Sequence, residues 1–177
     1  EVTWHISDRW DLTGGARYFD RKMDKKYFLE LPRYNETDDG VSTPNSKEND
    51  WVPKVSLAFN ATDNNMFYAL YSEGFLPGGT NRGRGLPFFP RQYDSDKLKN
   101  FEIGTKNTLA NGRVRLNATY FEMKWNDYQL EVVDPSNVPC GDDNALPEPN
   151  CGPPWQKVVA NVGNAKSRGL EVQFDWA

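Results

Sequence analysis

The 177-residue sequence lacks the features that mark several common protein classes. No apolar run approaches the ~18 residues of a membrane-spanning helix. The formal net charge is −4, so no basic face is available for nucleic acid. His5 is the only histidine, and no set of histidines can therefore hold a metal ion. We expect neither an enzyme nor a metal or cofactor site in this chain, and we expect no nucleic-acid partner.

What the sequence does contain is an alternation with period two around Asn111-Gly112, with Phe101, Ile103, Thr105 and Leu109 on one face before the turn. This dipeptide favours a two-residue type I′ turn, which needs positive φ at both central positions. Apolar positions recur with period two on both sides of the turn, which predicts a long β-hairpin. These positions are Phe101, Ile103, Leu109, Val114, Leu116, Ala118 and Tyr120. The alternation slips at Tyr120-Phe121, where either a bulge or emergence from a membrane would explain it.

The same period predicts five further strands, near residues 1–6, 10–24, 55–61 and 66–75 and before the end of the chain. Short turns near Asp8, Asn64 and Asn111 alternate with long polar segments at 25–50, 76–97 and 131–156. Membrane barrels have this asymmetry, with short periplasmic turns and long extracellular loops. The sequence therefore predicts an all-β fold, namely an antiparallel transmembrane β-barrel segment of about seven long strands in meander order.

The predicted barrel wall has one face toward lipid and one toward the lumen. We expect Leu116, Val172 and Phe174 to face lipid, and Arg115, Glu171 and Gln173 to face the lumen. Tyr and Trp prefer membrane interfaces, so we expect aromatic girdles near the strand ends. The candidates are Trp10, Trp51, Phe67, Tyr71, Tyr120, Trp125 and Trp176. An odd strand number, and ends that fall within strands, predict part of a larger barrel that does not close by itself.

Three motifs occur in the order typical of one known family. Residues 101–106 fit E-x-G-x-K within the hairpin, residues 72–81 fit S-x-G-F-x-P-G-G-x-N, and residues 161–171 fit N-x-G-x-A-x-x-x-G-x-E. Together they cover roughly residues 51 to 177, and they resemble the β-barrel of TonB-dependent outer-membrane receptors. Residues 1–177 are thereby interpreted as part of such a barrel domain, with the plug domain and the closure of the barrel outside the chain.

The resemblance implies a receptor of the bacterial cell outer membrane that takes up a scarce ligand actively. The ligand expected from the family is a ferric siderophore, and the partner that supplies energy is the TonB–ExbB–ExbD complex. That complex would act through parts that are absent here, while this chain contacts outer-membrane lipid. Two alternatives remain at this stage: a soluble secreted β-sandwich that binds carbohydrate, and an outer-membrane barrel that does not transport.

Candidate ligand-binding residues lie in the segment 76–97, which combines arginines with aromatic residues. Arginine pairs with anionic oxygens, and aromatic rings cover apolar or catecholate faces. The candidates are Arg82, Arg84, Phe88, Phe89, Arg91 and Tyr93; the alternative is a solvated loop without ligand contact. The nearby glycines, including Gly78 and Gly79, lack the G-K-[ST] sequence of a phosphate-binding loop and predict a flexible segment.

The only two cysteines, Cys140 and Cys151, lie within one predicted outer loop. A disulfide between them would close about a dozen residues, worth roughly 3 kcal/mol in the chain-entropy model. Such a bond requires an oxidising compartment, such as the periplasm or the cell surface. Two unrelated free thiols are the alternative.

Overall fold

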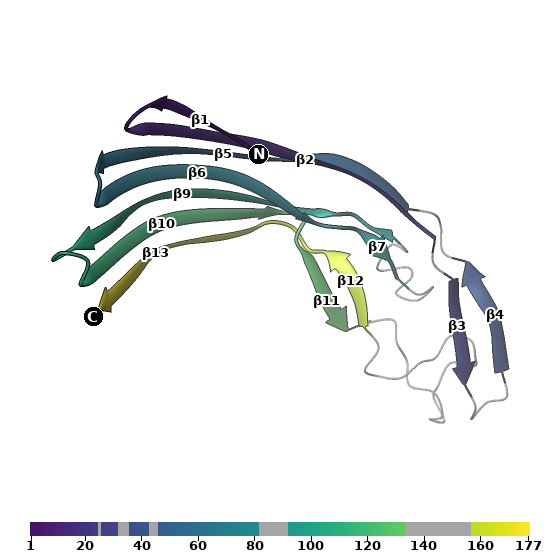
Figure 1. Cartoon of the computed structure of the whole chain (residues 1–177). Helices are drawn as coiled ribbons and strands as arrows, with labels where there is room; N and C mark the ends of the chain where they lie inside the picture. The colour runs from purple at the N-terminus through teal and green to yellow at the C-terminus, as the bar shows by residue number, and fades with distance from the viewer. Residues whose placement is uncertain (25, 32–35, 43–45, 82–91, 134–156) are drawn as a thin grey trace.

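The computed structural model describes residues 1–24, 26–31, 36–42, 46–81, 92–133 and 157–177 (Figure 1). For residues 26–31 and 36–42 only the backbone is described. All regular elements in these ranges are β-strands. No helix in the described part of the chain is long and apolar enough to cross a membrane.

Seven long strands form one curved antiparallel sheet. They are β1 (Val2–Ser7), β2 (Trp10–Met23), β5 (Ser46–Thr62), β6 (Asn65–Leu76), β9 (Asp96–Leu109), β10 (Val114–Asn126) and β13 (Ala165–Trp176). Their spatial order is β1-β2-β5-β6-β9-β10-β13, so each strand pairs with the next long strand along the chain. The predicted meander of seven long strands is therefore confirmed.

Three short hairpins extend from one end of this sheet, and the tight turns lie at the other end (Figure 1). The hairpins are β3 (Lys26–Leu31) with β4 (Glu36–Ser42), β7 (Gly79–Thr80) with β8 (Gln92–Tyr93), and β11 (Gln129–Val133) with β12 (Lys157–Asn161). We call these two ends of the sheet the loop end and the turn end.

The prediction that residues 25–50 form only a loop is wrong. The ladder between β2 and β5 continues as far as the pair Met23 and Ser46, and the β3–β4 hairpin follows it. The strands β4 (ETDDGVS) and the start of β5 (SKEND) are polar, whereas β3 (KYFLEL) is mostly apolar. Backbone hydrogen bonds between two strands do not require apolar side chains. Polar strands beyond the apolar part of the wall cannot be recognised by hydrophobic alternation.

The turn at Asn111-Gly112 has the backbone that the dipeptide predicts, but it is longer. Leu109 pairs with Val114, so four residues connect the strands. Ala110, Asn111 and Gly112 have φ values of 52°, 56° and 88°. Gly112 N donates to Leu109 O (3.2 Å) and Arg113 N donates to Ala110 O (3.3 Å), which makes two overlapping turns. The expected two-residue turn is thus replaced by a pair of turns offset by one residue.

The register gives the sheet one apolar face and one polar face. Leu116 lies directly opposite Phe174, and Ala118 opposite Val172, so these residues share the apolar face. Arg115 lies opposite Asp175, and Asn117 opposite Gln173, on the polar face. The side chains of the apolar face are open to the surroundings, with Val172 60% and Phe174 61% exposed. The structure therefore places the predicted lipid-facing and lumen-facing residues on opposite sides of the wall.

The apolar face ends at an aromatic residue on five consecutive strands. The next outward residue toward the loop end is polar or charged on every one of them. We call the set of last apolar residues the aromatic row; it consists of Tyr18, Trp51, Tyr71, Phe101 and Tyr120, and Leu170 takes the same position on β13. Trp10 and Phe59, with ring centroids 4.5 Å apart, lie at the opposite edge near the turns.

This aromatic row crosses the sheet obliquely. Tyr71 lies opposite Val55, which is four residues nearer the turn end than Trp51. Phe101 lies opposite Tyr71 on one side and Glu122 on the other, and Tyr120 is two residues nearer the turn end than Glu122. The edge thus shifts by six residues over five steps from β2 to β13. When strands lie about 4.8 Å apart and are tilted by about 40°, an edge parallel to the membrane moves by about 1.2 residues from one strand to the next. The aromatic row therefore runs parallel to a membrane that the strands cross at the tilt of a barrel.

The thickness of the apolar face agrees with the same geometry. Trp10 and Tyr18 are eight residues apart on β2, which is about 26 Å along the strand and about 20 Å along the membrane normal at a 40° tilt. The apolar band of outer-membrane barrels is about 25 Å tall. Trp125 does not belong to either edge: it lies opposite Leu98 on the polar face, so its predicted place in a girdle is wrong.

The slip at Tyr120-Phe121 is not a bulge. The β9–β10 and β10–β13 ladders run without interruption from Val114 to Trp125. Tyr120 belongs to the aromatic row, and the next two outward residues are Glu122 and Lys124. The alternation changes because the strand emerges from the apolar band at this point.

The exposed apolar face predicts that this segment alone does not form a soluble monomer. The chain has an accessible surface of 12714 Å², whereas a compact monomer of 20.3 kDa would expose about 8,800 Å². We expect the isolated segment, expressed without detergent, to sediment as aggregates without near-UV circular dichroism. A monomer with fixed aromatic signals would contradict the assignment of the apolar face to lipid.

Candidate functional site

The buried residues of the described chain gather at the loop end rather than within the sheet. Seven described residues are buried, and they come from β7 and the residues on either side of it, the start of β9 and the β12 strand. We call them, with their polar partners, the loop-stem cluster; the buried members are Gly78, Gly79, Thr80, Asn81, Asp96, Val158 and Ala160. The wall is one layer thick, so tertiary packing is concentrated where the chain leaves it.

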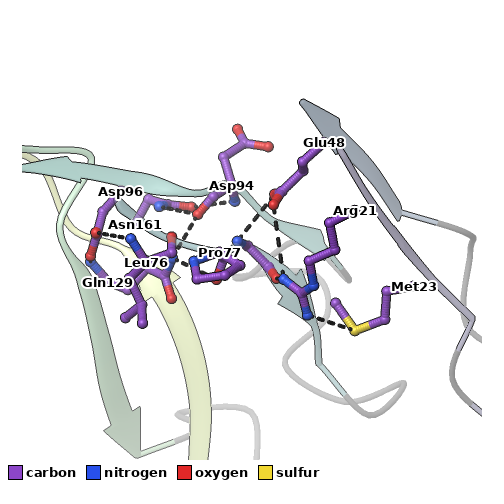
Figure 2. A network of polar contacts seen from close by, with 10 residues as sticks. Arg21, Met23, Glu48, Leu76, Pro77, Asp94, Asp96, Gln129 and Asn161 are labelled. Carbon is purple, nitrogen blue, oxygen red and sulfur yellow. Dashed lines mark hydrogen bonds and ion pairs between the residues drawn. The ribbon is translucent and has the colours of Figure 1, made fainter. Parts of the chain in front are cut away.

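The centre of the loop-stem cluster is the carboxylate of Asp96, which is 2% exposed. Its Oδ1 accepts a hydrogen bond from Leu76 N (3.1 Å), and its Oδ2 accepts one from Gln129 N (3.4 Å). The Gln129 side chain returns the contact, because its Nε2 donates to the carbonyl oxygens of Leu76 (3.0 Å), Pro77 (3.1 Å) and Asp94 (3.1 Å). Figure 2 shows these groups converging on the corner after β6.

Two asparagines join the β7–β8 hairpin to the β11–β12 hairpin. Asn161 accepts from Asp94 N (2.8 Å) and donates to the carbonyls of Asp94 (3.0 Å) and Asp127 (2.7 Å). Asn81 donates to Val159 O (2.8 Å) and accepts from Val159 N (2.9 Å), so its amide binds the β12 backbone as a strand partner would. The stems of two long segments are thereby held together at both asparagines.

Arg21 and Glu48 attach the corner at Gly78 to β2 and β5. Arg21 Nη1 donates to Gly78 O (3.0 Å), and Glu48 Oε1 accepts from Gly78 N (3.1 Å). A Cβ at Gly78 would collide with Glu48 Oε1 and with the carbonyl of Tyr93. Only glycine therefore fits here, and the prediction that Gly78 and Gly79 are flexible is wrong, since both are buried.

A second contact closes the gap where β5 and β6 separate. Their ladder stops at the pair Lys54 and Ser72. Beyond it, the Phe19 and Phe75 rings stack with centroids 3.7 Å apart, and Lys97 forms an ion pair with Asp50. Side chains thus replace backbone pairing on the path from the wall to the loop-stem cluster.

The structure tests the position of one of the six predicted ligand residues. Tyr93 lies on β8 opposite Gly79, is half-buried, and places its ring where a Cβ of Gly79 would be. Tyr93 is therefore packed into the stem. The other five candidates, Arg82, Arg84, Phe88, Phe89 and Arg91, lie outside the described residues, as do Cys140 and Cys151. The segment that holds the five candidates starts after Asn81 and ends before Gln92.

The residues that build this stem could not be identified from the sequence. The polar residues of the stem are far apart in the sequence, and no local pattern distinguishes them from solvent-exposed polar residues. They are Arg21, Glu48, Asp96, Gln129 and Asn161. The motif at 72–81 was the available signal: its Phe75, Gly78, Gly79 and Asn81 all make specific contacts in the stem.

The polar face carries cross-strand hydrogen bonds suited to a hydrated interior. The Tyr68 and Thr119 hydroxyls are 2.8 Å apart, and Thr3 and Thr13 are 3.0 Å apart. His5 Nδ1 lies 2.5 Å from Asp11 Oδ1, whose other oxygen accepts from Asn60 Nδ2 at 3.2 Å. No group of three metal-ligating side chains converges within the ranges that the structure describes.

The sheet is a single antiparallel layer with an exposed apolar face, an oblique aromatic edge and a polar opposite face. These features are those of the wall of a transmembrane β-barrel. All 177 residues match the family model "TonB dependent receptor-like, beta-barrel", and the chain belongs to this family of outer-membrane receptors. The predicted family and localisation are thereby confirmed. The predicted alternative of a soluble two-sheet sandwich is wrong, because the seven long strands form one sheet.

Similar proteins agree with this assignment. The chain is 24% identical over 176 residues to the pesticin receptor of Yersinia enterocolitica, covering 99% of the chain and 22% of that protein. It is 23% identical over 170 residues to the metal-pseudopaline receptor CntO of Pseudomonas aeruginosa, covering 96% of the chain and 20% of the relative. The ferric yersiniabactin uptake receptor FyuA of Yersinia pestis has the same fold, with a TM-score of 0.70 at 23% identity, over 98% of this chain and 22% of that one. The chain thus spans about a fifth of the length of these relatives.

Proposed function

We propose that the receptor containing this segment takes up an anionic metal chelate, most simply a ferric siderophore, across the outer membrane. Energy would come from the TonB–ExbB–ExbD complex, acting through parts of the receptor outside this chain. Membership of the family supports active uptake, and the similarity to receptors named for metal-pseudopaline and ferric yersiniabactin supports the class of ligand.

The observation that carries the proposal is the fixed stem beneath the segment 82–91. Asn81 is bound to Val159, and Tyr93 is packed against Gly79. The ordering of both stem strands lowers the entropy lost when a loop between them binds a ligand. Three arginines and two phenylalanines in that segment supply positive charge and aromatic surface. Their role is to bind the anionic oxygens and the apolar faces of the chelate.

The variant Arg82→Ala with Arg84→Ala tests this role in the intact receptor. Loss of two charge-assisted hydrogen bonds is expected to weaken the affinity for the receptor's own chelate by about tenfold or more, and less at high salt. Binding is measured on purified receptor, with surface abundance checked by antibody labelling of cells.

Arg9→Ala with Arg113→Ala is the matched control, because it removes the same charge at the turn end. It should leave the affinity unchanged. Unchanged binding by the loop variant, at normal abundance, would exclude Arg82 and Arg84 from the site and move the search to residues outside this chain.

A further inference from the structure

Beyond the aromatic row, the outward face carries a second regular set of residues. The six wall strands considered are β2, β5, β6, β9, β10 and β13. On five of them, the residue four positions beyond the aromatic-row position, toward the loop end, is lysine. We call these residues the lysine row: Lys22, Lys47, Lys97, Lys124 and Lys166; Phe75 takes the equivalent position on β6. Four residues place the row about 13 Å along each strand and about 10 Å above the edge of the apolar band.

Each lysine of this row is exposed, and the Lys97 side chain pairs with Asp50, which the alternation of β5 places on the polar face. The residues between it and the aromatic row are of mixed sign: Asp20, Asn49, Glu73, Lys99, Glu122 and Arg168. Positive charge is therefore concentrated at one height, just above the apolar band. The headgroup layer extends about 5–8 Å beyond the hydrocarbon, and a lysine stem can bend toward it.

The lysines oppose one another across the strands. Lys22 pairs directly with Lys47, and Lys124 with both Lys166 and Lys99. Like charges that lie directly opposite destabilise a sheet. Lysines lie opposite each other in this way in two separate parts of the wall. Anions that neutralise their charge would therefore stabilise the sheet.

The acidic groups of the wall neutralise only some of the lysines. Glu122 accepts ion pairs from Lys124 (3.1 Å) and Lys166 (2.9 Å), and Asp50 pairs with Lys97. For Lys22 and Lys47, no ion pair with another described residue is present. Lys99 and Arg168 differ, because each lies directly opposite an acidic residue, Glu73 and Glu122 respectively. Lys22 and Lys47 are therefore two cations that lie opposite each other with no acidic partner among the described residues.

We propose that the lysine row binds the phosphate groups of anionic lipid in the outer leaflet of the outer membrane. The tight turns mark the periplasmic end, so the loop end, and this row with it, lies at the outer leaflet. The aromatic row holds the hydrocarbon edge, and the lysines above it bind the headgroup phosphates. The bound lipid neutralises the opposed lysines and fixes the height of this part of the wall. This site is on the outer surface and does not depend on which ligand the receptor transports.

The test uses the intact receptor, freed of lipid in detergent and titrated with lipid A, with bound lipid counted by native mass spectrometry. Lys22→Gln with Lys47→Gln removes two cations that have no acidic partner among the described residues. Since each lysine at an anionic surface contributes measurably, the pair should weaken lipid A binding about tenfold. Lys22→Arg with Lys47→Arg should restore it.

Arg17→Gln with Lys54→Gln is the matched control, because it removes the same charge from the polar face of the same two strands. It should change lipid A binding by less than about twofold. Dephosphorylated lipid A should bind weakly to every variant. Equal affinity of the wild type and the Lys22→Gln/Lys47→Gln variant for lipid A, or equal affinity of the wild type for phosphorylated and dephosphorylated lipid, would overturn the proposal.

Discussion

The variant Leu116→Arg should destabilise the membrane-embedded receptor by about 2–4 kcal/mol, because it places a charge at the middle of the apolar band. Leu116 lies on the apolar face, four residues nearer the turn end than Tyr120 of the aromatic row. The apolar face spans eight residues on β2, so four residues from its edge is its midplane. The free energy of unfolding is measured by reversible denaturant titration of the full-length receptor in lipid vesicles.

The matched variant is Asn117→Arg, one residue further on and on the opposite face. Asn117 lies opposite Gln173, and its Nδ2 donates to Gln173 Oε1 at 3.4 Å. An arginine there extends into the hydrated interior and should cost far less than at Leu116. Equal losses at the two positions, or a larger loss at Asn117, would reverse the assignment of the faces.

The wall could be predicted from the sequence because its physical requirement is local. Each strand must present alternate residues to lipid, and Leu170, Val172, Phe174 and Trp176 show that period without interruption. The turn at Asn111-Gly112 could be predicted because few residue pairs adopt positive φ readily. Both signals weaken above the membrane, where β4 and the first part of β5 are polar and need only backbone pairing.

The stem and the two outward rows could not be predicted in the same way, because they depend on register. Lys22 and Lys47 oppose each other only because β2 and β5 pair with one specific offset. Asp96 lies at the start of β9 in the wall and meets Gln129 at the start of the β11–β12 hairpin, while Asn161 at the end of that hairpin binds Asp94 (Figure 2). The motif at 72–81 marks the location, but the partners of Gly78 and Asn81 lie 30 to 78 residues away.

Asp96→Ala should open the loop-stem cluster while leaving the wall intact. The substitution removes the acceptor of both Leu76 N and Gln129 N in a site that is 2% exposed. Two part-buried donors without acceptors should lower the local opening free energy by about 1–3 kcal/mol, which corresponds to roughly 5- to 150-fold faster amide exchange. Hydrogen–deuterium exchange of the intact receptor measures this at Leu76, Gln129 and Val159.

Asp94→Ala separates the loss of these hydrogen bonds from the loss of charge. Asp94 is two residues away and exposed, and it contributes to the cluster through its backbone N and O rather than through its carboxylate. Its exchange should match that of the wild type. If the stem prepares the segment 82–91 for binding, Asp96→Ala should also weaken the affinity for the chelate, although every arginine of that segment is intact. The reason is that the stem then has to become ordered when the ligand binds, and the entropy that this costs reduces the affinity. Faster exchange with unchanged affinity would mean that the stem stabilises the receptor without preparing the ligand site, and unchanged exchange would show that Asp96 does not hold the stem.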